Sequence, residues 1–220
     1  MTEPEFVART RESYDATADD FAVWIARELA AKPLDSAMLG AFAALVTGPV
    51  ADIGCGSGRV TAHLAGLGVS AFGVDLSPGM VAAARRTYPA LRFEVGSMLS
   101  LDLDDGSLGG LVAWYSIIHV PDEVLPSVLA EFHRVLAPGG YLLLAFQAGT
   151  GVFPLTSAGG HAVALDFHRR QPEAVTDLLR EAGFAPRAQL VREPDAGGEF
   201  PEQTPQAFLL AHKPPTAPDV

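Results

Sequence analysis

Short apolar runs alternate with helical patterns through the middle of the chain, from residue 49 to residue 147. Five of these runs predict β-strands, at residues 49–53, 71–75, 91–95, 111–116 and 141–146. The fifth run contains YLLLAF and is apolar on both faces, which is typical of a central parallel strand covered by helices. Strands that alternate with helices in this way predict an α/β fold with a doubly wound, mostly parallel sheet.

The helices expected around these strands have recognisable ends. Ser77 and Pro78 are the residue types preferred at an N-cap and at the first helical position. Pro or Gly follows closely where two of the other helical patterns end. The patterns place helices at residues 60–67, 78–88, 122–136 and 172–182.

Two further strands are expected at residues 186–193 and 205–212, joined by a loop rich in Pro, Gly and acidic residues. A connection without a helix favours antiparallel pairing, so we expect a Rossmann-like sheet of seven strands with a C-terminal antiparallel hairpin. Amphipathic helical patterns before the first strand predict a helical N-terminal cap or lid over the ligand crevice. The expected organisation is a cap at residues 1–46, a ligand-binding domain at residues 47–213 and a tail at residues 214–220.

Charge and composition restrict the classes of partner. The chain of 220 residues carries a net charge of −11, which would repel a phosphate backbone and disfavours a nucleic-acid partner. Acidic residues near the N-terminus, and Pro and Gly residues within the longest uncharged stretch, argue against a secretory signal and a membrane span. The single cysteine, Cys55, fits a reducing compartment, so we expect a cytoplasmic protein.

The first expected strand runs into a glycine-rich loop, DIGCGSG, at residues 52–58. Glycines at alternate positions let the backbone turn sharply and approach a ligand closely, just before a helix N-terminus. Asp75 ends the second strand, 21 residues after Gly54, where a carboxylate can accept ribose hydroxyl protons. Together these features predict a site for an adenosine-type ligand at the carboxyl ends of the strands.

Glycines alone do not identify that ligand. The dinucleotide fingerprint G-x-G-x-x-G would require glycine at position 59, where this chain has Arg59, and no tyrosine is followed four residues later by lysine. The G-x-x-x-x-G-K-[ST] sequence of a P-loop is also missing. An NAD-dependent oxidoreductase is therefore a disfavoured alternative.

Five segments follow one another along the chain: VADIGCGSG (50–58), GVDLSPGMVAAAR (73–85), FEVGSM (93–98), LVAWYSIIHV (111–120) and RVLAPGGYLLLAF (134–146). Taken in order, they resemble the motifs of the class I S-adenosyl-L-methionine (SAM)-dependent methyltransferase family. The opening YDATADDFA (14–22) and the closing AGF (182–184) are similar as well. One departure is Gly109, where the family often has an aspartate that is usually structural. The resemblance implies SAM as the cofactor.

The resemblance also implies which residues would bind the cofactor. Its methionine part would lie against Asp52, Gly54, Gly56 and Gly58, and Asp75 would hold the ribose. The residues expected near the adenine are Leu76, Met80, Ser97 and Met98, and Tyr115 is expected to reach the cofactor from the fourth strand.

Three further residues are candidates for catalysis. His119 follows the fourth strand, where the family places residues beside the transferable methyl group, so it could act as a base; the alternative is a histidine that caps the next turn. Tyr14 matches a family position near the cofactor, with plain packing as the alternative. His161 lies in the segment expected to form a lid loop, residues 147–170, with an exposed loop histidine as the alternative. No His or Cys pair has the spacing of metal ligands, so no metal site is expected.

We therefore expect an enzyme that transfers a methyl group from SAM to a small-molecule acceptor by in-line displacement. Apolar residues of the two expected lids, such as Trp24 and Phe153, favour a moderately hydrophobic or aromatic acceptor. The protein is expected to be a monomer or a homodimer, with neither nucleic acid nor membrane as a partner. A non-catalytic protein that keeps the cofactor pocket is the main alternative.

Overall fold

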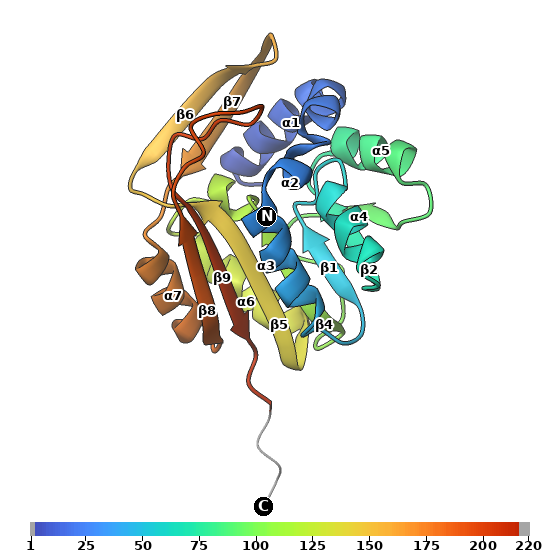
Figure 1. Cartoon of the computed structure of the whole chain (residues 1–220), viewed down its shortest axis with the longest axis vertical. Coiled ribbons are helices and arrows are strands. Elements are labelled where there is room, and N and C mark those ends of the chain that lie inside the picture. The colour runs from blue at the N-terminus through green and yellow to red at the C-terminus, as the bar shows by residue number, and fades with distance from the viewer. Residues whose placement is uncertain (1–2, 216–220) are drawn as a thin grey trace, which may run out of the picture.

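A computed structural model describes residues 3–215 of the chain and is built around one large sheet (Figure 1). The strand order in this seven-stranded sheet is β3-β2-β1-β4-β5-β9-β8, with parallel pairing up to β5 and antiparallel pairing of β9 with β5 and β8. This confirms the expected Rossmann-like sheet and its C-terminal hairpin. The strands are β1 (Val50–Ile53), β2 (Ala71–Asp75), β3 (Phe93–Val95), β4 (Leu108–Trp114), β5 (Leu136–Gln147), β8 (Ala185–Arg192) and β9 (Gln206–His212).

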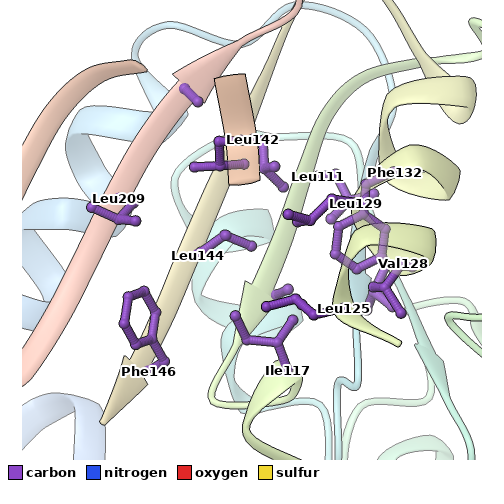
Figure 2. Packing of buried hydrophobic residues seen from close by; sticks show 14 of the residues in the cluster. Leu111, Ile117, Leu125, Val128, Leu129, Phe132, Leu142, Leu144, Phe146 and Leu209 are labelled. Carbon is purple, nitrogen blue, oxygen red and sulfur yellow. The ribbon is translucent and has the colours of Figure 1, made fainter. Parts of the chain in front are cut away.

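Helices cover both faces of the sheet because the central strands are apolar on both sides. On β5, Leu142 and Leu144 belong to one buried cluster and Leu143 to another. The first cluster includes residues of α6 (Leu125–Val135) and α7 (Pro172–Glu181), and Figure 2 shows its packing between α6 and the strands. The second includes residues of α3 (Pro33–Ala43) and α4 (Arg59–Gly66).

The start of α5 (Pro78–Thr87) has the capping expected from its sequence. Ser77 Oγ accepts a hydrogen bond of 3.0 Å from the Met80 backbone N–H, and Pro78 is the first helical residue. Two other expected boundaries were wrong. α6 begins at Leu125 instead of residue 122, and β5 begins at Leu136 instead of residue 141. The reason is an irregular pairing with β4, in which Leu136 lies opposite Leu108 before the regular register resumes.

Gly109 has a packing reason for differing from the aspartate expected at this position. A Cβ atom on Gly109 would lie 1.5 Å from the carbonyl oxygen of Thr47, so no side chain fits there without moving the backbone. The missing carboxylate therefore reflects a close backbone approach at the start of β4.

The segment between β5 and α7 is not the loop expected from the sequence. It forms an antiparallel hairpin of β6 (Val152–Ala158) and β7 (His161–His168), separate from the main sheet. Gly159 and Gly160 connect the two strands with positive φ angles of 57° and 84°, as a tight type I′ turn requires. In Figure 1 the hairpin stands beside α1 (Glu5–Ile25), and the two elements are in contact.

The region before β1 is helical, as expected, but it does not form a single cap. Leu39 and Phe42 of α3 are fully buried in the cluster that covers the sheet, whereas α1 packs on α5 and β7. Of the helices before β1, α1 and the short α2 (Glu28–Ala31) lie at the cavity described below. Most of the expected tail, residues 216–220, lies outside the described residues. Across residues 3–215, no helix has the length and hydropathy needed to cross a bilayer.

Candidate active site

A cavity of about 1000 Å³ opens beyond the carboxyl ends of β1, β2 and β4, with α1 and the β6–β7 hairpin on its other side. This volume is at the upper end of the range of small-molecule pockets, about 300–1,000 Å³, which leaves room for an acceptor beside a nucleoside cofactor. The position is the one at which parallel α/β sheets bind their ligands.

The glycine loop after β1 lines this cavity and needs glycine at three positions for different reasons. Gly54 has a φ of 75°, and a Cβ atom there would lie 2.2 Å from the Cβ of Ser116. Gly56 has a φ of 54° and faces open space, with the Phe21 ring 3.9 Å from the position of a Cβ. Gly58 does not line the cavity. A Cβ there would instead meet Phe93 at 2.7 Å, so its role is in packing.

Asp75 is held at the end of β2 by backbone donors from both neighbouring loops. Its Oδ2 accepts a hydrogen bond of 2.7 Å from the Gly56 N–H, and its Oδ1 accepts one of 2.8 Å from the Ser77 N–H. Burial raises the pKa of Asp75 to about 6, against the opposing effect of these donors. The carboxylate is therefore ionised at neutral pH, and each oxygen keeps a lone pair for a ligand hydroxyl.

Asp52 is the most deeply buried carboxylate of the cavity wall, with no exposed surface. Its Oδ2 accepts a hydrogen bond of 2.7 Å from Thr61, whereas its Oδ1 has no hydrogen-bond partner among residues 3–215. Burial raises the pKa of Asp52 to about 6. A buried acceptor left without a donor is costly, so a cationic or donor group of a ligand would fit here.

The residues expected around the adenine fall into two sets. Leu76, Ser97 and Met98 line the cavity. Met80 does not, because its side chain is fully buried in the first turns of α5. The predicted contact of Met80 with the cofactor is therefore wrong, because Met80 packs behind the cavity wall.

Tyr14 and His119 meet at the cavity wall, although 105 residues separate them in the chain. The Tyr14 hydroxyl lies 2.8 Å from Nε2 of His119, and Nδ1 of His119 lies 3.0 Å from the carbonyl oxygen of Asp166. Since a carbonyl only accepts, Nδ1 carries the proton, and Nε2 accepts from the Tyr14 hydroxyl. Burial lowers the pKa of His119 to about 4 and raises the pKa of Tyr14, so both groups are neutral at neutral pH.

Tyr115 lies at the end of β4 in a strained conformation. Its φ of 54° is in the left-handed region that favours glycine. The residue lines the cavity, and its ring packs edge-on against Trp114 with centroids 5.9 Å apart. Its hydroxyl is buried without a hydrogen-bond partner in the part of the chain that the structure describes. Strain of this kind is concentrated at ligand sites.

His161 lies outside the cavity, contrary to the role expected for it. It begins β7 beside the hairpin turn, and its Nε2 lies 2.8 Å from Oδ2 of Asp20 on α1. Arg9 and Ser13 of α1 also reach β7: Arg9 Nη2 donates to Asp166 Oδ2 at 2.9 Å, and Ser13 Oγ accepts from the Ala164 N–H at 2.9 Å. His161 therefore joins the hairpin to α1, and we assign it no part in the chemistry.

Several residues that the sequence did not single out also contribute to the site. Asp15 of α1 accepts hydrogen bonds from Ser77 Oγ at 2.5 Å and from the Gly79 N–H at 2.8 Å, which fixes α1 against the start of α5. Arg59 and Glu28 line the cavity as an ion pair of 3.2 Å. Arg59 directly follows the glycine loop, and this adjacency is the one signal that could have identified it. Within residues 3–215, no group of His, Cys, Asp and Glu side chains could hold a metal ion.

Residues 50–140, which contain the glycine loop, Asp75 and His119, match the family model described as a methyltransferase domain. The chain is 37% identical over 92 residues to a demethylmenaquinone methyltransferase of Chlorobaculum tepidum, covering 41% of this chain and 37% of that protein. It is 31% identical over 138 residues to a probable SAM-dependent methyltransferase of Mycolicibacterium smegmatis, covering 61% of this chain and 51% of that protein. The chain thus spans only about a third to a half of the length of these relatives.

A solved structure described as a DhpI–SAH complex is similar over 97% of this chain and 100% of its own, with a TM-score of 0.75 and 19% identity. This likeness shows the fold. The arrangement of helices and strands in this chain is therefore that of the solved structure. Residues 50–140 thus match a methyltransferase-domain model, in agreement with the resemblance of their motifs.

Proposed function

We propose that the chain transfers a methyl group from SAM to a small-molecule acceptor by in-line displacement. One observation carries this proposal: the glycine loop and Asp75 line the same cavity as the hydrogen-bonded pair of Tyr14 and His119. One part of this cavity fits a nucleoside cofactor, and the other offers a proton acceptor to a second ligand.

The cofactor would be held by groups that the protein leaves available. Asp75 would accept hydrogen bonds from the ribose hydroxyls, and the backbone of Gly56 would let the cofactor approach closely. The unpaired Oδ1 of Asp52 would face the amino group of the methionine part. Leu76, Ser97 and Met98 would lie against the adenine. When bound, SAM supplies a methyl group that is already activated on a sulfonium, so the protein needs mainly to align the acceptor with it.

The Tyr14–His119 pair would take the proton that an acceptor atom loses. Tyr14 Oη would accept this proton while passing its own to Nε2 of His119, because the hydrogen bond between them already points that way. Since the pKa of His119 is lowered to about 4, the resulting imidazolium is a strong acid and would release the proton once the product leaves. Tyr14 is then the group that touches the acceptor, and His119 acts through it.

The alternative of a non-catalytic binding protein would be favoured if side chains filled the space beside Tyr115 and His119. Both residues line the open cavity, which supports an acceptor site instead. A cytoplasmic location is part of this proposal, and the single cysteine supports it.

A methylation assay tests the proposal. The purified protein would be incubated with SAM and a panel of small aromatic acceptors, and the formation of S-adenosylhomocysteine (SAH) would be followed with Asp75→Ala as a control. We expect SAH formation with some acceptors and little with the variant. Tight binding of SAH without turnover of any acceptor would support the non-catalytic alternative.

A further inference from the structure

The inner face of the β6–β7 hairpin carries a row of cavity-lining residues that ends in a cation. Leu165, Phe167 and Arg169 alternate along one face, as the two-residue period of a strand requires, and all three line the cavity. Phe153 and Leu155 of β6 lie opposite Phe167 and Leu165 and line it too. The hairpin thus presents an apolar surface with one guanidinium at its end.

Arg169 differs from its neighbours in lacking an acidic partner within the described residues 3–215. Among residues 3–215, no carboxylate lies within salt-bridge distance of it, and its buried Nε has no hydrogen-bond partner. Its guanidinium carbon lies over the face of the Phe153 ring, 5.2 Å from the ring centroid. A buried donor without an acceptor is costly, so a ligand oxyanion would supply the acceptor that the Arg169 Nε–H group lacks.

The other arginines near the cavity have structural partners. Arg170, the next residue, donates to the carbonyl oxygens of Ile117 and Val120 and pairs with Asp122. Arg11 pairs with Glu3, and Arg59 with Glu28 at 3.2 Å. The chain has a net charge of −11, so acidic residues are in excess. An arginine that lines an apolar cavity wall and has no acidic partner among residues 3–215 therefore needs an explanation.

We propose that Arg169 binds the carboxylate of the methyl acceptor, and that the acceptor is a small aromatic acid. The inference rests on the proposed function and specifies its substrate class. The Phe167 ring lies next to the His119 ring, with centroids 4.8 Å apart, and precedes Arg169 by two residues on the same face. An acceptor packed on Phe153 and Phe167 therefore has its carboxylate at Arg169 and its reacting atom toward Tyr14 and His119. The guanidinium would form charge-assisted hydrogen bonds with the carboxylate.

The test uses pairs of probes that differ only in charge: salicylate and salicylamide, cinnamate and cinnamamide, ferulate and ferulamide. Each is titrated by calorimetry into the whole 220-residue chain saturated with SAH. We expect at least one acid to bind about tenfold to hundredfold more tightly than its amide, as a charged hydrogen bond predicts. In Arg169→Met this preference should disappear, and in Arg169→Lys part of it should remain. Arg187→Met, which removes an exposed arginine of β8 outside the cavity, should retain it.

Each other result overturns the inference. Equal affinity for acids and amides, or no binding of any acid, would show that Arg169 does not select a carboxylate. A loss of SAH affinity in Arg169→Met would place Arg169 at the cofactor instead. Failure of SAH to bind to the unmodified protein would refute the proposed function itself, which keeps the two failures distinguishable.

Discussion

Replacing Asp52 by Asn should change how the stability of the cofactor-free protein depends on pH. Asp52 is fully buried, and only one of its two carboxylate oxygens has a hydrogen-bond donor within residues 3–215. Burial therefore raises its pKa from 3.8 in the unfolded chain to about 6 in the folded protein. The folded state prefers the protonated carboxyl, whereas at neutral pH this group is ionised.

The sign and size of the effect follow from this difference in pKa. The stability that Asp52 contributes is fully present below pH 3.8 and is lost as the pH rises from 3.8 to about 6. The whole change corresponds to about 3 kcal/mol, of which about 2 kcal/mol falls between about pH 4 and about pH 7.5. An asparagine has no such titration, and its amide oxygen can still accept from Thr61. Relative to the wild type, Asp52→Asn should therefore gain about 2 kcal/mol over this range of pH.

Urea unfolding of both proteins at several pH values between these limits measures this gain. The comparison uses the change with pH, so any constant cost of burying the amide cancels. Asp102→Asn, which removes the same charge from an exposed loop, is the matched control. Its free energy of unfolding should change with pH as that of the wild type does. Parallel stability curves for Asp52→Asn and the wild type would refute the reasoning. The same variant should bind SAM more weakly, since it loses an anion from the cavity wall.

Three other substitutions test separate parts of the site. Asp75→Ala removes an acceptor for ribose hydroxyls, so SAM affinity in calorimetry should fall by about tenfold or more, and unchanged affinity would contradict the ribose assignment. His119→Ala should lower turnover on the order of a hundredfold with little change in SAM affinity. Equal turnover would leave His119 with a purely structural role. Turnover of the unmodified protein should not show an acid limb near pH 6.5 from His119, because the pKa of His119 is lowered to about 4. Gly54→Val should destabilise the protein by more than about 2 kcal/mol, because its Cβ would lie 2.2 Å from that of Ser116 at a φ of 75°; a wild-type melting temperature would contradict this.

The parallel part of the main sheet could be predicted from the sequence because its central strands are apolar on both faces and alternate with helical patterns. The β6–β7 hairpin was missed because many of its residues are at least partly exposed and its strands contain Pro154, Thr156 and Ser157. Gly159-Gly160 was the local signal for it, since two consecutive glycines supply the positive φ angles of a tight hairpin turn. The role of α3 in covering the sheet could not be read from its pattern, because a helix can bury an apolar face against either a lid or a sheet.

The part of the cavity proposed for the cofactor could be predicted because it follows local motifs: the glycine loop and Asp75 are fixed by the strand ends that carry them. The part proposed for the acceptor could not be predicted in the same way. Tyr14 and His119 were each named from the sequence, but their hydrogen bond depends on how α1 packs against the hairpin. His161 was misassigned and Arg169 was overlooked for the same reason. Tertiary packing decides which face of a hairpin points into a cavity. The spacing of residues along the chain does not reveal this.

The most direct test of the central claim is a calorimetric titration of the purified protein with SAM, SAH and NAD(H). We expect SAM and SAH to bind with dissociation constants on the order of micromolar, and we expect no binding of NAD(H). Binding of NAD(H) in preference to SAM and SAH, or no binding of SAM and SAH, would contradict that claim.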